Sequence, residues 1–340
     1  MVRKGGAFIS LVSFLLGIVF LFIVFSVINP GEIIASLRKI TLWQFLAILI
    51  LRLAFGILGA LKWRIILEFY SARTSFAYQH SVSFWKLYLY KLASFAVEYF
   101  TQVTVIGGQV AGVVLLRGER VPTRVGVAVM VIDSVTTSFI TMMVSFVATT
   151  IFLLTRFSNG PVTTLVLLTF LILLLFLFAF LFTLRIGPSI KEKKKVSFWE
   201  RTALSLRDLV LASSDFFKNN KRGVGVLLAV SLLGHAGVLL EIFLILLFLG
   251  NAVGILEAAI IETGYTFAFL TPISQALGTA EAAGAYTLSL LGYSAALGVG
   301  LTLILRVRHL LIGFLGIGVL IVYGVVKFPF KTKSERHFLW

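Results

Sequence analysis

Six long apolar runs dominate the sequence and constrain its fold more than any other feature. Each is at least as long as the roughly 20 residues that an α-helix needs to cross the hydrocarbon core of a bilayer. In hydrocarbon a helix satisfies all of its own backbone hydrogen bonds, which an isolated strand does not. The sequence therefore predicts an all-α polytopic membrane protein, with spanning helices at 8–28, 41–61, 125–154, 161–184, 223–250 and 295–324.

Composition supports this class and narrows the chemistry. Of the 340 residues, 59% are hydrophobic and 13% are charged, whereas about a quarter of a soluble domain is charged. The net charge of +16 would suit nucleic acid, but basic residues in a membrane protein sit in cytoplasmic loops beside anionic headgroups, so we expect no nucleic-acid partner. The absence of cysteine excludes disulfides and thiolate metal sites. The four histidines are scattered, so we expect neither a metal nor a cofactor.

Two further hydrophobic stretches, 92–116 and 255–292, are interrupted by Gly, Thr and Gln, and the second also by Pro and Glu. Irregular backbone is costly in hydrocarbon unless protein buries it or it lines a wet cavity. We therefore expect each stretch to form a re-entrant hairpin or a broken helix, which makes six spanning helices plus two hairpins. The alternative is a pair of ordinary helices joined by a loop.

The distribution of basic residues favours the hairpins. If each broken stretch enters and leaves on one side, most of the 30 Lys and Arg residues fall on a single face of the membrane. The positive-inside rule makes that face cytoplasmic. It carries both termini and segments 62–91, 117–124 and 185–222. A full crossing by 92–116 would instead place the basic segment 117–124 outside.

A weak internal repeat relates the two halves of the chain. At an offset of 172 residues, which separates Ala111 from Ala283, Ala111-Gly112 pairs with Ala283-Gly284 and Gly126-Val127 with Gly298-Val299. The offset superposes the two broken stretches and the long helix that follows each. With the first hairpin entering from inside and the second from outside, the halves form an inverted repeat, a plan common among transporters.

We expect one transmembrane domain over 1–340, with pseudo-repeat halves at about 1–155 and 161–325, joined by the basic cytoplasmic segment 185–222. This segment mixes lysines with Phe, Trp and Leu, which is typical of an amphipathic helix on the anionic inner leaflet. A solvated linker is the alternative.

Ionisable residues inside the apolar segments are candidates for function, because each costs roughly 2.5–3.5 kcal/mol to insert. Arg306 and Arg308 lie mid-helix, and we expect one of them to bind an anionic headgroup or to pair with Glu281; the planar guanidinium matches a phosphate bidentately. A purely structural ion pair is the alternative. The hairpin tips add backbone N–H groups that could cradle a phosphate. The predicted lipid-binding cavity comprises Glu98, Gln102, Gly107, Gly108, Gln109, Asp133, Pro272, Gly278, Glu281, Arg306 and Arg308.

Enzyme motifs are largely missing. The sequence contains no P-loop, no dinucleotide-binding glycine fingerprint and no HExxH zinc motif. Asp133 and Glu98 could serve as acid and base in a membrane-embedded transferase, and an ion-coupled transporter would use the same acids as proton carriers. We expect a protein that is not an enzyme.

The broken stretches and the helices after them resemble a known family. In the first half the resemblance rests on Ile106–Gln109, Leu115–Arg117 and Val129–Asp133, and in the second on Thr271-Pro272, Leu277–Ala282, Leu291-Gly292 and Leu303–Arg306. Together these resemble the lysylphosphatidylglycerol synthase transmembrane-region family, the flippase-like membrane domain of the multiple peptide resistance factor, here in a stand-alone form. Family members usually carry a Pro before the first Gly-Gly and a Glu after it; this chain has Thr104-Val105-Ile106 and Gln109.

The resemblance implies a role in moving lipids. In fused members a separate soluble domain transfers lysine onto phosphatidylglycerol, and the membrane part is thought to move the product between leaflets. Because this chain ends at Trp340, we expect no aminoacyl-transfer domain. The expected function is translocation of an anionic or phosphate-bearing lipid, a phospholipid or a polyprenyl lipid, across the cytoplasmic membrane. The alternative is an accessory subunit that presents lipid to a separate glycosyl- or aminoacyl-transferase.

Overall fold

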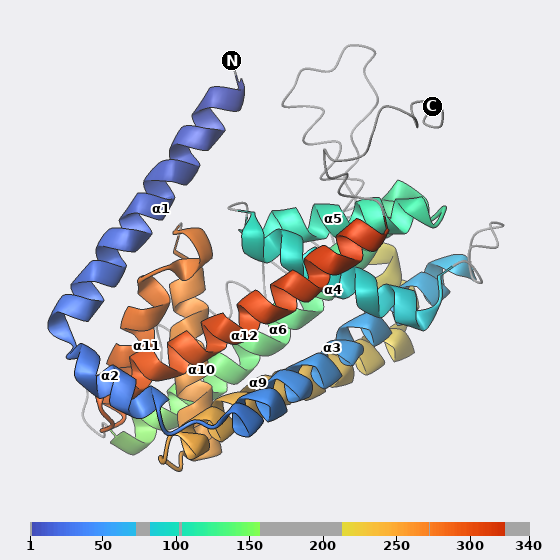
Figure 1. The fold of residues 1–340 in the computed structure, drawn as a ribbon. Helices are drawn as coiled ribbons and strands as arrows, with labels where there is room; N and C mark the ends of the chain where they lie inside the picture. Colours follow the sequence, from blue (N-terminus) through green and yellow to red (C-terminus); the bar gives the residue numbers. More distant parts are fainter. Residues whose placement is uncertain (1, 73–81, 102–103, 157–212, 272, 324–340) are drawn as a thin grey trace.

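The computed structural model describes residues 2–72, 82–101, 104–156, 213–271 and 273–323, and within these ranges the regular structure is entirely helical. Figure 1 shows an elongated bundle, with α1 and α2 at one edge. In chain order the helices are α1 (Val2–Val27), α2 (Pro30–Leu37), α3 (Leu42–Ser71), α4 (Phe84–Phe100), α5 (Thr104–Gly118), α6 (Thr123–Arg156), α9 (Lys221–Phe248), α10 (Ile255–Phe269), the 3-10 turn η2 (Ser274–Ala276), α11 (Thr279–Leu290) and α12 (Ala295–Val322).

Four of these helices, α3, α6, α9 and α12, are long and apolar enough to cross a membrane. The α1–α2 pair, bent by 91°, makes a fifth candidate if it is one span. Five of the six predicted runs therefore coincide with these helices. The sixth, 161–184, lies outside the described residues, as do most of the basic segment 185–222 and the chain beyond 323.

Helix α3 extends beyond the predicted end of the second span. The prediction places the end of this span at residue 61 and a cytoplasmic segment at 62–91, whereas α3 continues to Ser71 and α4 begins at Phe84. Lys62, where the apolar run stops, is buried in the protein, only 6% exposed, and donates to Thr137. A charge that is satisfied inside a bundle lowers hydropathy without ending the helix.

Polar caps set where several helices begin. Asn29 caps α2 and Pro30 follows at the first helical position, where a missing N–H has no cost. Thr41 starts α3 with a reciprocal capping box to Gln44. The side chains of Ser83 and Ser294 cap α4 and α12, and each accepts the backbone N–H of the residue three positions later. These caps satisfy donors that would otherwise be orphaned at the helix ends.

Both predicted breaks fall between two packed helices. The first separates α4 from α5, and the second separates α10 from α11, with η2 between them. The four helices have 17, 15, 15 and 12 residues, each shorter than the roughly 20 residues of a full crossing. Each pair thus consists of two short helices that pack against each other across the break.

The helix boundaries repeat at the offset found in the sequence. When the residue numbers of the first half are increased by the offset of 172 that separates Ala111 from Ala283, the last residue of α5 coincides with the last residue of α11. The first residue of α6 then coincides with the first residue of α12. In Figure 1, α6 and α12 run in opposite directions across the molecule, and so do α3 and α9. The unit of hairpin followed by long helix therefore occurs twice.

Helix α12 holds the two units together because it packs against both α11 and α4. A Cβ built on Gly298 would lie 2.2 Å from the carbonyl oxygen of Gly284 in α11, and one built on Gly316 would lie 2.2 Å from the carbonyl oxygen of Leu92 in α4. Only glycine permits backbones to approach so closely, as at small-residue contacts in membrane helices.

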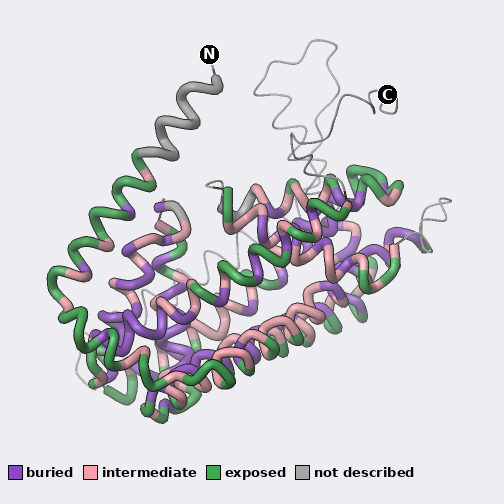
Figure 2. The backbone as a smooth tube through the Cα atoms, viewed as in Figure 1, coloured by how far each residue is buried: buried purple, intermediate pink, exposed green. Residues whose placement is uncertain are grey.

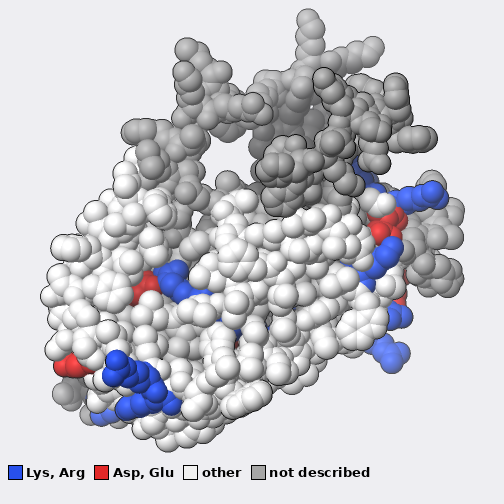
Figure 3. Space-filling view, in the orientation of Figure 1, with Lys and Arg blue, Asp and Glu red and all other residues white. Residues whose placement is uncertain are grey.

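The surface matches a bilayer environment. In Figure 3 one face is almost free of charge, with Lys, Arg, Asp and Glu gathered near its two ends and one small charged group between them. Large apolar side chains such as Phe22, Ile50 and Phe314 are exposed along the helices. Figure 2 colours the exposed residues green, and they occur along the length of the bundle. Trp43 and Trp85, 79% and 63% exposed, stand near the first residues of α3 and α4, the position of interfacial aromatic belts.

Candidate functional site

A cavity of about 450 Å³ lies between the two helical units, bounded by α3, α4, α5, α6, α9, α10 and α12. Apolar side chains such as Phe55, Phe95 and Ile312 form part of its wall. Charged and titratable side chains reach it from five helices. These are Arg52, Lys62, Tyr88, Lys91, Glu98, Asp133, His235 and Glu262. An apolar enclosure with a few convergent polar groups is the usual form of a ligand site.

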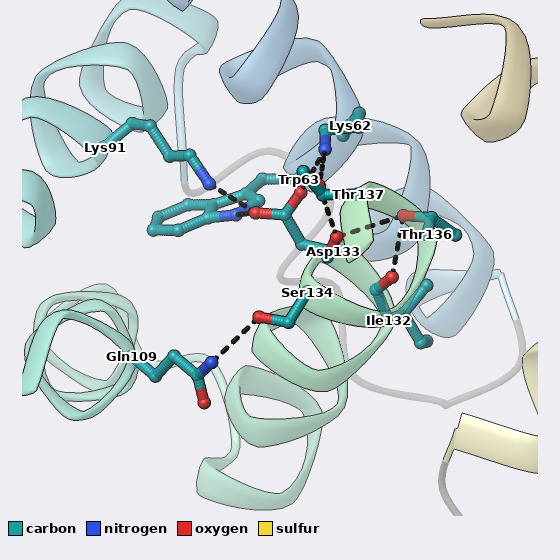
Figure 4. Close-up of polar contacts among 9 residues, drawn as sticks. All are labelled: Lys62, Trp63, Lys91, Gln109, Ile132, Asp133, Ser134, Thr136 and Thr137. Carbon is teal, nitrogen blue, oxygen red and sulfur yellow. Dashed lines mark hydrogen bonds and ion pairs between the residues drawn. The ribbon is translucent and has the colours of Figure 1, made fainter. Parts of the chain in front are cut away.

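Asp133 on α6 is the centre of the polar wall (Figure 4). Its carboxylate forms ion pairs with Lys62, at 2.5 Å, and with Lys91. The indole Nε1 of Trp63 donates to Asp133 Oδ2 at 2.9 Å, and Lys62 Nζ also donates to Thr137 Oγ1 at 2.6 Å. Two ammonium groups against one carboxylate leave positive charge facing the cavity.

The cations differ in how freely they can reach a ligand. Lys62 is nearly buried, whereas the Lys91 side chain is 33% exposed and lies 4.8 Å from the centre of the Trp63 ring, a cation–π contact. Arg52 on α3 makes no hydrogen bond or ion pair within the described part of the chain. Arg52 and Lys91 are therefore the two cations available to an anion entering the cavity.

Hydroxyl groups continue the wall along α6. Ser134, Thr137, Ser138 and Thr141 all line the cavity, and their spacing places them on one helix face. Gln109 on α5 donates from Nε2 to Ser134 Oγ at 2.8 Å, which ties the first hairpin to this face. Neutral donors of this kind bind a polar headgroup without holding a fixed charge in the membrane.

The two hairpin tips meet. Gln275, beside the second break, donates from Nε2 to the carbonyl oxygen of Glu98 at 3.0 Å, close to the last turn of α4. Gln275 and Ala276 have positive φ angles of 53° and 48°, a conformation that costs a non-glycine residue roughly 1–2 kcal/mol. Arg306 on α12 stabilises it by donating to both of their carbonyl oxygens, at 3.3 and 3.1 Å.

Glu281 on α11 completes this clamp. It is fully buried, forms an ion pair with Arg306 through two bonds, one of them 2.9 Å long, and accepts the N–H of Gly278 at 2.8 Å. Gly278 itself has a φ of 79° and lies against the backbone of α1, so a side chain there would collide. The clamp fixes the second tip against α12 and α1.

The structure assigns different partners to the two arginines of α12. Of the alternatives predicted for them, pairing with Glu281 is confirmed for Arg306, while Arg308 pairs with Glu241 on α9 and contacts His309. Neither arginine is among the residues that line the cavity. Asp133 and Glu98, considered together as an acid and a base, do not pair: Asp133 is bound by two lysines.

The remaining predicted residues divide between the cavity and the tips. Glu98, Gly108 and Gln109 line the cavity, and a Cβ on Gly108 would lie 2.8 Å from the carbonyl oxygen of Ser94, so this glycine lets α5 approach α4. Gly107 lies beside Thr101 at the first tip. Gln102 and Pro272 lie outside the described residues.

Sequence reasoning missed three residues of the polar wall, Lys62, Trp63 and Lys91. It counted both lysines as cytoplasmic loop charges. Within the described ranges no group of His, Asp and Glu is arranged to hold a metal ion.

A family model described as "Lysylphosphatidylglycerol synthase TM region" matches residues 10–316, which include both hairpins, the cavity residues and the clamp. A search of curated proteins and a search of solved structures returned no significant match.

Proposed function

Because the chain belongs to the lysylphosphatidylglycerol synthase transmembrane-region family, a family of membrane domains, we propose that it moves an anionic or phosphate-bearing lipid across the cytoplasmic membrane. One observation carries the proposal. The cavity between the two units combines available cations, Arg52 and Lys91, with a hydroxyl wall inside an apolar enclosure. A headgroup can exchange its water for these groups while its acyl or prenyl chains stay in hydrocarbon.

The proposal includes a topology. Six spanning helices and two re-entrant hairpins form an inverted repeat, with both chain termini in the cytoplasm. The matching helix boundaries of the two units and their opposite directions support the inversion. Basic residues support the orientation, because Lys86, Arg117 and Arg124 flank the first hairpin at the end opposite Arg38 and Arg156. This end is cytoplasmic by the positive-inside rule.

The partner is a lipid with a phosphate or other anionic headgroup, either a phospholipid or a polyprenyl lipid. The positive charges of Arg52 and Lys91 favour such a lipid, because a guanidinium and an ammonium form charge-assisted hydrogen bonds with phosphate oxygens. The protein then acts as a translocator and not as an enzyme. A separate transferase would supply or consume the lipid, and an accessory role beside such an enzyme is the alternative.

Reconstitution in liposomes tests the proposal. Phosphatidylglycerol with a fluorescent acyl chain is distributed in both leaflets, and a membrane-impermeant reductant quenches the outer one; protein that moves lipid makes the inner pool accessible. We expect Arg52→Gln and Lys91→Gln to slow this step roughly tenfold or more, since each loses a charge-assisted hydrogen bond worth about 1.5–3 kcal/mol.

Lys86→Gln is the matched control. Lys86 lies on the same helix as Lys91 but binds Glu119 outside the cavity at 3.1 Å, so we expect wild-type rates. Equal rates in all three variants would reject the cavity as the pathway. Absence of lipid movement in the wild-type protein, together with co-purification of a transferase, would favour the accessory role.

A further inference from the structure

A second polar group lies in the same cavity, apart from the lysines. His235 on α9 and Glu262 on α10 both line the cavity. Their side chains are only 6% and 11% exposed, and His235 Nε2 lies 3.7 Å from Glu262 Oε2. Ser231, one helical turn before His235, also lines the cavity. An imidazole and a carboxyl side by side in a buried place need a physical reason.

The facing atoms of this group lack hydrogen-bond partners. His235 Nε2, Glu262 Oε2 and Ser231 Oγ are all buried, and none has a hydrogen-bond partner among the described residues. The opposite atoms are held: Glu262 Oε1 accepts from Thr266 at 3.1 Å, and His235 Nδ1 is 3.5 Å from Thr141 Oγ1. The contacts with Thr266 and Thr141 thus hold one side of each side chain, while His235 Nε2 and Glu262 Oε2 lie 3.7 Å apart without a hydrogen bond.

The surrounding charges do not neutralise this pair. The titratable and charged groups inside the bundle on the elements packed against α9 and α10, and on these two helices, are Arg52, Lys62, Tyr70, Asp133, Glu241, Tyr265, Glu281, Arg306, Arg308 and His309. Three carboxylates of this set are already paired: Asp133 with Lys62, Glu241 with Arg308 and Glu281 with Arg306. Across the cavity, Lys91 also pairs with Asp133, and Glu98 faces the same space.

We propose that Glu262 and His235 form a proton-binding site that couples lipid movement to a proton gradient. The pair takes up one proton, as an O–H bond on Glu262 or an N–H bond on His235, and it releases the same proton when the cavity opens to the other side. The proton and the anionic headgroup occupy the same cavity, so the positive charge of the proton offsets the negative charge of the headgroup. This inference rests on the proposed lipid translocation and supplies its energy source.

Proton binding is tested first, without transport. Infrared difference spectra of the purified protein are recorded across a pH titration, because a protonated carboxyl has a C=O band that a carboxylate lacks. Glu262→Gln should remove one titrating carboxyl band, and His235→Gln should keep that band but move its midpoint. Glu68→Gln is the control, since this carboxylate is 52% exposed and lies outside the cavity. A titration that neither cavity variant alters would overturn the proton site.

Coupling is tested next in liposomes with a pH gradient. If one proton moves with each lipid, a gradient of one pH unit shifts the leaflet distribution of labelled phosphatidylglycerol by up to about tenfold, since one pH unit is a tenfold ratio of proton activity. Glu262→Gln should lose the response. Wild-type protein that moves lipid but ignores the pH gradient, or follows a sodium gradient at constant pH, would overturn the inference and leave the proposed function intact. Wild-type protein that moves no lipid would defeat the proposed function, while the infrared titration still decides the proton site.

Discussion

Removing one partner of the ion pair between Arg306 and Glu281 should destabilise the protein strongly, because the other charge would be left buried and unpaired. Arg306→Met leaves the fully buried Glu281 carboxylate without its counter-ion, which costs about 3–5 kcal/mol in a protein interior. It also removes both donors that hold the carbonyl oxygens of Gln275 and Ala276 in their strained conformation. The second tip should therefore loosen in this variant.

A double-mutant cycle measures the pair itself. Arg306→Met, Glu281→Gln and the double variant are unfolded reversibly in mixed micelles by increasing SDS, and tryptophan fluorescence reports the transition. We expect a coupling energy of about 2–3 kcal/mol. The exposed Arg64–Glu68 pair on α3, with side chains 53% and 52% exposed, is the control and should give about 0.3–0.5 kcal/mol. Equal coupling in both cycles would refute the reasoning.

Three further predictions follow from other contacts. Gly298→Val places a Cβ 2.2 Å from a main-chain oxygen of α11, and we expect the free energy of unfolding to fall by about 1–3 kcal/mol. The melting temperature in detergent should fall accordingly, and an unchanged melting temperature would show that α11 and α12 can separate. Trp63→Phe removes the 2.9 Å hydrogen bond to Asp133; lipid movement should slow by several-fold while the protein stays folded, and wild-type rates would mean that this bond does not position the carboxylate. Single cysteines at Arg117 and Arg38 should react with an impermeant maleimide from opposite sides of the membrane, since the native chain has no cysteine; labelling from one side would reject the topology.

The long helices and both breaks were predictable because they follow from local physics. Apolar length identified α3, α6, α9 and α12, and runs of Gly, Thr and Gln marked the breaks now seen between α4 and α5 and between α10 and α11. These signals lie within a few residues of the feature that they specify. The internal offset was also visible, although only a few residues are identical across it.

Pairings between distant residues were harder to predict. Lys62 and Asp133 are separated by 71 positions, and Arg308 and Glu241 by 67, so spacing along the chain gives no sign of either pair. Lys62 and Lys91 were misplaced for a second reason. Hydropathy treats any lysine near the end of an apolar run as a loop residue, although its long stem can lie along a helix and present its charge inward.

The division of labour between the two kinds of cation supports the proposed pathway. The planar guanidinium of Arg306 makes several fixed hydrogen bonds at once, and such a fork suits a rigid clamp. An ammonium is a compact charge on a flexible stem, so in the proposed pathway Lys91 would leave Asp133 for a lipid phosphate while the helices stay in place. Lys62 remains on Asp133 when Lys91 moves, which keeps that carboxylate paired. The clamp thus holds the tips in place, while Lys91 provides a charge that can change partners.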